Sequence, residues 1–87
     1  MTDIPRVPLA VPELGLEAAP VWLSLWLVPE GARVTEGDRV AELLVDGATI
    51  DLEAPVSGRL VAQLVDEDEA VAVGAVLAEF EADSAAP

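Results

Sequence analysis

A chain of 87 residues has room for one domain with a small core, and the absence of cysteine excludes disulfides and thiolate metal sites. Because 53% of the residues are hydrophobic and few are aromatic, burial of aliphatic side chains must hold the fold together. The formal net charge of −13 repels phosphates and anionic lipid headgroups, which excludes nucleic acid and membrane surfaces as partners. The same charge favours a partner with a basic surface, or simply keeps a small domain soluble.

The apolar residues fall into short runs separated by glycine, proline or acid clusters, a pattern typical of β-strands. No segment carries apolar residues at helical spacing over ten or more residues with a cap at its start. We therefore expect an all-β domain at 9–82, with tails at 1–8 and 83–87. In chain order, the expected strand-like runs are VWLSLWLV (21–28), RVT (33–35), RVAELLV (39–45), TIDL (49–52), GRLVAQLV (58–65), AVAV (70–73) and AVLAEF (75–80).

The second half of the chain repeats the first. VPEGARVTEGDRVAELLV (28–45) aligns with VDEDEAVAVGAVLAEFEA (65–82) at a constant offset, and Gly37 then matches Gly74. Two copies are too few for a solenoid, which needs at least about three repeats. We therefore predict two packed antiparallel sheets related by an approximate two-fold axis.

A tight hairpin is predicted between the halves. The runs ELLV and TIDL flank DGA, and Asp-Gly between strands is a strong hairpin signal because glycine accepts the positive φ of such a turn. Asp46 and Gly47 should therefore lie at an exposed tip. The core does not need these residues, so they are free to serve a surface role.

Four motifs, in order and at the right spacing, resemble the biotinyl/lipoyl domain family, and within it the lipoyl domains of 2-oxo acid dehydrogenase acyltransferases. The resemblance covers 11–81 and implies a flattened β-barrel, or barrel-sandwich hybrid, of two four-stranded antiparallel sheets with quasi-two-fold symmetry. This expectation agrees with the internal repeat. The motifs are VPELG (11–15), WLVPEGARVTEGDRVAEL (26–43), EAPVSGRL (53–60) and VGAVLAEF (73–80).

The resemblance also implies a site at the hairpin tip, where the family reads approximately E-T-D-K-A and the lysine carries lipoate or biotin. Here Asp46 and Ala48 take the aspartate and alanine positions, and Gly47 stands at the lysine position. Amide formation needs a nucleophilic amine, and all four basic residues of the chain are arginines. We expect neither lipoate nor biotin. Because the whole chain lacks lysine, the pattern favours a natural variant over an engineered one.

The function that follows is a non-catalytic, stand-alone lipoyl-like module. It has no histidine, no cysteine nucleophile and no glycine-rich phosphate loop. The resemblance implies that it docks on a component of a 2-oxo acid dehydrogenase or other acyl-transfer complex, as an accessory to a genuine carrier or its competitor. No run approaches the roughly 18 apolar residues of a membrane span and no leader is recognisable, so we expect a cytoplasmic protein. The expected docking residues are Val45, Asp46, Gly47, Ala48, Asp51 and Glu53.

Two alternative functions belong to other classes of protein. One is a swinging-arm carrier, of lipoate more readily than of biotin, whose attachment lysine was lost or mutated. The other is the adaptor of a membrane efflux system, which inserts a long helical hairpin between the halves of the same barrel. The tight turn expected at Asp46 and Gly47 argues against the adaptor.

Two further features allow more than one interpretation. The run DEDE (66–69) is a hard-cation site, a recognition patch for a basic partner, or a solvated turn. Consecutive carboxylates rarely converge on one ion and no calcium-loop pattern is present, so we expect no metal. Trp26 matches a core tryptophan of the family and should be buried. Trp22 either packs beneath the N-terminal segment or forms an exposed contact.

Overall fold

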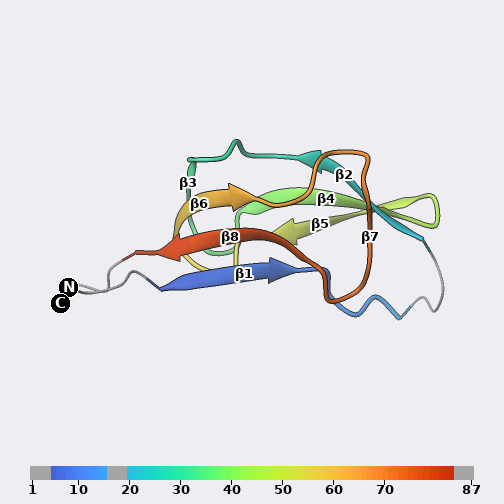
Figure 1. Ribbon diagram of the computed structural model, residues 1–87, viewed down its shortest axis with the longest axis horizontal. Coiled ribbons are helices and arrows are strands. Elements are labelled where there is room, and N and C mark those ends of the chain that lie inside the picture. Colours follow the sequence, from blue (N-terminus) through green and yellow to red (C-terminus); the bar gives the residue numbers. More distant parts are fainter. Residues whose placement is uncertain (1–4, 16–19, 84–87) are drawn as a thin grey trace.

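The computed structural model describes residues 5–15 and 20–83, and these residues form eight β-strands (Figure 1). The described segments contain no helix, and so none that could serve as a membrane span. The all-β class expected from the sequence is confirmed. The strands are β1 (Arg6–Ala10), β2 (Val21–Trp26), β3 (Arg33–Val34), β4 (Arg39–Val45), β5 (Ala48–Glu53), β6 (Gly58–Gln63), β7 (Ala70–Val71) and β8 (Val76–Ala82).

The strands form two four-stranded antiparallel sheets, with the orders β1-β8-β6-β3 and β5-β4-β2-β7. The start of β1 and the end of β8 lie at one end of the molecule, and the hairpin of β4 and β5 projects at the other (Figure 1). This is the flattened sandwich of two sheets that the sequence predicts. Within the described residues no strand pairing joins the two sheets into a closed barrel.

The internal repeat of the sequence is also a repeat of the structure. Strands β6, β7 and β8 each begin 37 positions after β2, β3 and β4. If each strand is replaced by its counterpart in the other half (β1 by β5, β2 by β6, β3 by β7 and β4 by β8, and the reverse), one sheet order becomes the other. The register shifts agree as well, since β2 shifts against β4 between Leu23 and Leu25, and β6 shifts against β8 between Leu60 and Ala62. The predicted two-fold relationship is therefore confirmed, and it includes the positions of the register shifts.

Two equivalent sets of hydrogen bonds join the halves. The backbone N–H of Trp26 donates to Oε2 of Glu67 at 2.8 Å, and the backbone N–H of Gln63 donates to Oε2 of Glu30 at 2.8 Å. Trp26 and Gln63 also donate a side-chain N–H, each to a carbonyl oxygen in the same connecting segment at 3.0 Å. Each half thus fixes a connecting segment of the other half through one charge-assisted and one neutral hydrogen bond.

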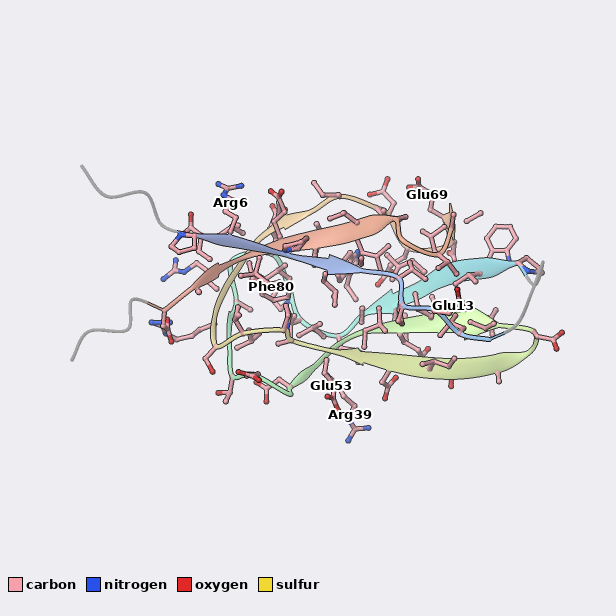
Figure 2. The ribbon with its side chains drawn as sticks, turned by 90° about the horizontal axis from the view of Figure 1, so that it is seen from below. Arg6, Glu13, Arg39, Glu53, Glu69 and Phe80 are labelled. Carbon is pink, nitrogen blue, oxygen red and sulfur yellow. The ribbon has the colours of Figure 1, made fainter. Side chains whose placement is uncertain are left out.

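The core lies between the two layers and contains aliphatic residues together with Phe80, which is fully buried and is seen in the interior in Figure 2. Burial of one leucine or phenylalanine side chain contributes about 1.5–3 kcal/mol. Val40 and Ala41 are neighbours and are both buried, because the register of β4 against β5 shifts there. Trp26 is partly buried and packs against this core.

The N-terminal boundary differs from the expectation. Residues 1–8 were expected to form a tail, but β1 begins at Arg6 and pairs with β8 along its whole length. Leu9 of this strand is 8% exposed and belongs to the core. Pro8 obscures the strand in the sequence, and it is tolerated because β1 lies at the edge of its sheet. Residues 1–4 and 84–87 of the expected tails lie outside the described part.

Candidate functional site

The hairpin tip has the geometry that the Asp-Gly dipeptide predicts. Val45 pairs with Ala48, and only Asp46 and Gly47 lie between them. Their φ angles are 49° and 79°, so both adopt the left-handed conformation of a type I′ turn. Aspartate tolerates this conformation better than most residues, and glycine adopts it without a steric cost. The junction of β4 and β5 is thus a two-residue turn, which disagrees with the helical hairpin of an efflux adaptor.

Gly47 has open space around it. A Cβ atom built on Gly47 meets no heavy atom within 4 Å, apart from its chain neighbours. A side chain there would therefore project into solvent, and its only cost would be the left-handed backbone, about 1–2 kcal/mol for a residue with a Cβ atom. The turn has room to present a long side chain but presents none.

The expected docking residues do not form one patch. The tip residues Asp46, Gly47 and Ala48 are exposed, whereas Val45 is only 1% exposed and belongs to the core. The side chain of Val45 is therefore not available to a partner. Glu53 ends β5, roughly 17 Å along the strand from Ala48, and Figure 2 places it away from the hairpin end, beside Arg39.

Charge is distributed unevenly over the molecule. The ion pairs of the described residues are all exposed, and each contributes at most about 1 kcal/mol. None of them involves Asp46 at the tip. Glu13 and Glu69 lie toward the hairpin end, and Arg6 lies at the opposite end (Figure 2). The pairs join Arg6 to Glu79 at 3.1 Å and to Glu81 at 3.9 Å, Arg33 to Asp83 at 2.7 Å, and Arg39 to Asp51 at 3.3 Å.

Comparison with known sequences identifies the class of domain. The profile of the Biotin_lipoyl family, described as biotin-requiring enzyme, matches residues 7–80, which is most of the chain. The chain belongs to this biotinyl/lipoyl domain family. The family assignment agrees with the two sheets, the two-fold repeat and the projecting hairpin.

Relatives of this lipoyl-like domain are acyltransferase components. It is 37% identical over 70 residues to the dihydrolipoyllysine-residue acetyltransferase component of the acetoin cleaving system of Pseudomonas putida, covering 80% of this chain and 19% of that protein. It is 33% identical over 75 residues to the lipoamide acyltransferase component of the branched-chain alpha-keto acid dehydrogenase complex of the same organism, covering 86% and 18%. A dihydrolipoyllysine-residue acetyltransferase component of the pyruvate dehydrogenase complex of Corynebacterium glutamicum is 35% identical over 70 residues, covering 80% and 10%.

The chain spans about a fifth or less of the length of these relatives. The region that matches is therefore one part of each of these larger proteins. They confirm the resemblance of this chain to the lipoyl domains of 2-oxo acid dehydrogenase acyltransferases. Two of these relatives are named as components of a dehydrogenase complex, and the third as a component of an acetoin cleaving system.

The structure places two exposed apolar residues side by side near the lipoyl-like hairpin, an arrangement that the sequence did not predict. Leu44 of β4 lies between Thr49 of β5 and Trp22 of β2, and Trp22 in turn lies beside Ala70 of β7. Trp22 is 41% exposed and Leu44 is 37% exposed, so of the two positions expected for Trp22 the exposed one is found. The tight turn already implied that Leu44 pairs with Thr49, but the position of Trp22 beside them follows only from the pairing of β2 with β4.

The acidic run of the lipoyl-like domain is part of its framework. Glu67 accepts the Trp26 backbone N–H, and Glu69 accepts the backbone N–H of Asp66 at 3.1 Å. Asp68 has a φ of 70° at the position where the first half has Gly31. Residues 66–69 thus form an ordered turn. In the described part of the chain no group of three or more acidic, histidine or cysteine side chains is arranged to hold a metal ion.

Proposed function

We propose that this lipoyl-like domain is a non-catalytic docking module that carries neither lipoate nor biotin. The observation that supports this best is an intact, projecting hairpin in a chain that contains no lysine. Attachment of either group requires a side-chain amine, and Gly47, at the position that resembles the attachment site, has none. The domain then acts through its surface alone.

The partner that we propose is a component of a 2-oxo acid dehydrogenase or related acyl-transfer complex in the cytoplasm. The relatives are named as components of acetoin-cleaving, branched-chain keto acid and pyruvate dehydrogenase systems, which supports this class. The exposed carboxylates of Asp46 and Asp51 favour a basic surface on the partner. In this role the domain assists or competes with a genuine carrier domain.

A second candidate function is a swinging-arm carrier, of lipoate more readily than of biotin, whose lysine was lost or mutated. The open space around Gly47 favours it, since a lysine there would reach solvent without a clash. Both candidates leave the chain itself unmodified, because it contains no lysine. They differ in one respect that can be measured, since only the carrier candidate requires that a lysine restored at position 47 is acylated.

The test is to incubate the natural chain and the Gly47→Lys variant with lipoate ligase or biotin ligase, ATP and the acid, and to measure intact mass. We expect no gain of mass for the natural chain and a lipoyl gain for Gly47→Lys. Ala48→Lys is the matched control, because it moves the amine by one residue. A modified natural chain would refute the proposal, and inert Gly47→Lys would show that Gly47 is not a vacated attachment position.

A further inference from the structure

Four residues form a continuous line across the outer face of the sheet β5-β4-β2-β7, next to the hairpin tip. Residues directly opposite in antiparallel strands point to the same face and lie about 4.5–5.5 Å apart at Cβ. All four are exposed, whereas Val21 and Val45, the strand neighbours of the two large side chains, are buried. We call this line the tip-side row. In the order β7, β2, β4, β5 it consists of Ala70, Trp22, Leu44 and Thr49.

The other half of the molecule provides an internal control for this row. The equivalent positions lie on the outer face of the sheet β1-β8-β6-β3, where Trp22 is replaced by Arg59 and Leu44 by Glu81, each 37 positions later. The same place in the fold is therefore occupied by charged, solvated side chains. The fold does not require an exposed indole and leucine there. In the order β3, β6, β8, β1 the equivalent row consists of Arg33, Arg59, Glu81 and Arg6.

Carboxylates border the tip-side row. Glu42 and Asp51 form the next cross-strand pair of β4 and β5 that faces the same side of the sheet, and Asp46 lies in the turn. Glu69 directly precedes Ala70 in the chain. Among the described residues only Asp51 of these four has an ion-pair partner, Arg39 at 3.3 Å. The row is thus an apolar centre within an acidic rim.

We infer that the tip-side row is a docking surface that inserts the Trp22 indole into an apolar pocket rimmed by lysine or arginine on a partner protein. A second copy of this chain is a poor occupant, because its acidic rim would meet an equal rim. Tryptophan supplies large contact area at little entropic cost and is enriched among residues that dominate binding. The class of the partner rests on the proposed docking function, whereas the chemistry of the contact rests on the residues of the tip-side row.

The experiment places a benzophenone side chain at position 70 of the natural chain in its host cell, which leaves Trp22 and Leu44 intact. The matched control carries it at position 33, the equivalent site in the other half. After irradiation, the crosslinked peptides are identified by mass spectrometry. We expect a partner crosslinked from position 70 and not from 33, through a segment with apolar residues next to lysine or arginine.

The second part of the experiment repeats the crosslinking from position 70 in a Trp22→Arg, Leu44→Glu variant. This variant carries the residues that the equivalent row has at these two places. We expect the crosslink yield to fall at least about tenfold, as for loss of a dominant contact residue. Thermal unfolding of the variant checks that it folds, and Trp22→Ser serves if it does not.

Equal yields from positions 70 and 33, an unchanged yield in the variants, a non-basic crosslinked surface, or crosslinks only to a second copy would each overturn the inference. The identity of the crosslinked protein tests the proposed function separately. If the crosslinked partner belongs to no dehydrogenase or acyl-transfer complex, the row stands as a docking surface and the proposed partner class fails.

Discussion

Gly47 and Gly58 are glycines for opposite physical reasons. Gly47 has a φ of 79° and open space, so its backbone conformation alone favours glycine. Gly58 has no such φ, but a Cβ atom there would collide with the backbone carbonyl of Glu81 on the neighbouring strand β8. The first position tolerates a side chain at the cost of local strain, whereas the second requires the two strands to move apart.

The residue-scale prediction is that Gly58→Ala destabilises the domain more than Gly47→Ala. We expect Gly58→Ala to lower the free energy of unfolding by about 3 kcal/mol, the upper part of the usual range for overpacking, because backbone must shift. Gly47→Ala should cost about 1 kcal/mol, the strain of a left-handed alanine. Urea unfolding followed by tryptophan fluorescence measures both. Equal losses in the two variants would contradict the steric assignment at Gly58.

The loops between strands are held by the opposite half of the molecule. Glu30 and Glu67 occupy equivalent positions in the two connections, and each carboxylate accepts a backbone N–H from a strand of the other half. Two carboxylates of the acidic run, Glu67 and Glu69, therefore have structural partners. This explains why part of the run is acidic without invoking a ligand.

The prediction at the level of elements concerns these two carboxylates. Glu67→Ala and Glu30→Ala should each lower the free energy of unfolding by about 1.5 kcal/mol, the contribution of a hydrogen bond to a charged group. Glu67→Gln should restore much of the loss, since its amide oxygen accepts the same N–H. Glu36→Ala, a change of the same type at an exposed turn, is the control for lost charge. If Glu67→Ala behaves like Glu36→Ala in thermal and urea unfolding, the bond does not stabilise the fold.

At the scale of the whole molecule, the two ends differ in charge. Arg6 and Arg33 pair with carboxylates near the start of β1 and the end of β8. The hairpin end carries Asp46, Glu13 and Glu69 without an ion-pair partner among the described residues. A basic partner surface is therefore attracted to the hairpin end, on top of the overall charge of −13.

The whole-molecule prediction is that docking depends on salt and on the hairpin end. Affinity for purified dehydrogenase components of the host, measured by biolayer interferometry, should fall roughly fivefold in an Asp46→Asn, Asp51→Asn variant, the effect of about 1 kcal/mol. Raising salt from about 50 to about 500 mM should reduce the difference through screening. Glu36→Gln with Glu79→Gln removes the same charge elsewhere and should bind like the natural chain. Absence of binding by the natural chain would refute the proposed docking function.

Patterns within the sequence alone predicted the β class, the two-fold repeat and the hairpin tip. The β class and the tip are local properties, because short apolar runs indicate strands and Asp46-Gly47 indicates a two-residue turn. The internal repeat predicted two packed sheets, and the resemblance of the motifs to a known family then predicted four strands in each. Pro8 concealed β1, because a strand at the sheet edge keeps its pairing on one side only and tolerates proline.

Which of these residues meet and which face water depends on how the strands pair and pack in three dimensions. Val45 and Asp46 are neighbours in the chain, yet one is buried and the other exposed, because strand side chains alternate between the core and the solvent. Trp22 lies beside Leu44 only through the pairing of β2 with β4, a contact between segments about twenty residues apart. Glu67 finds the Trp26 backbone only when the two halves close on each other. Such contacts depend on register and packing between distant segments, which local composition does not encode.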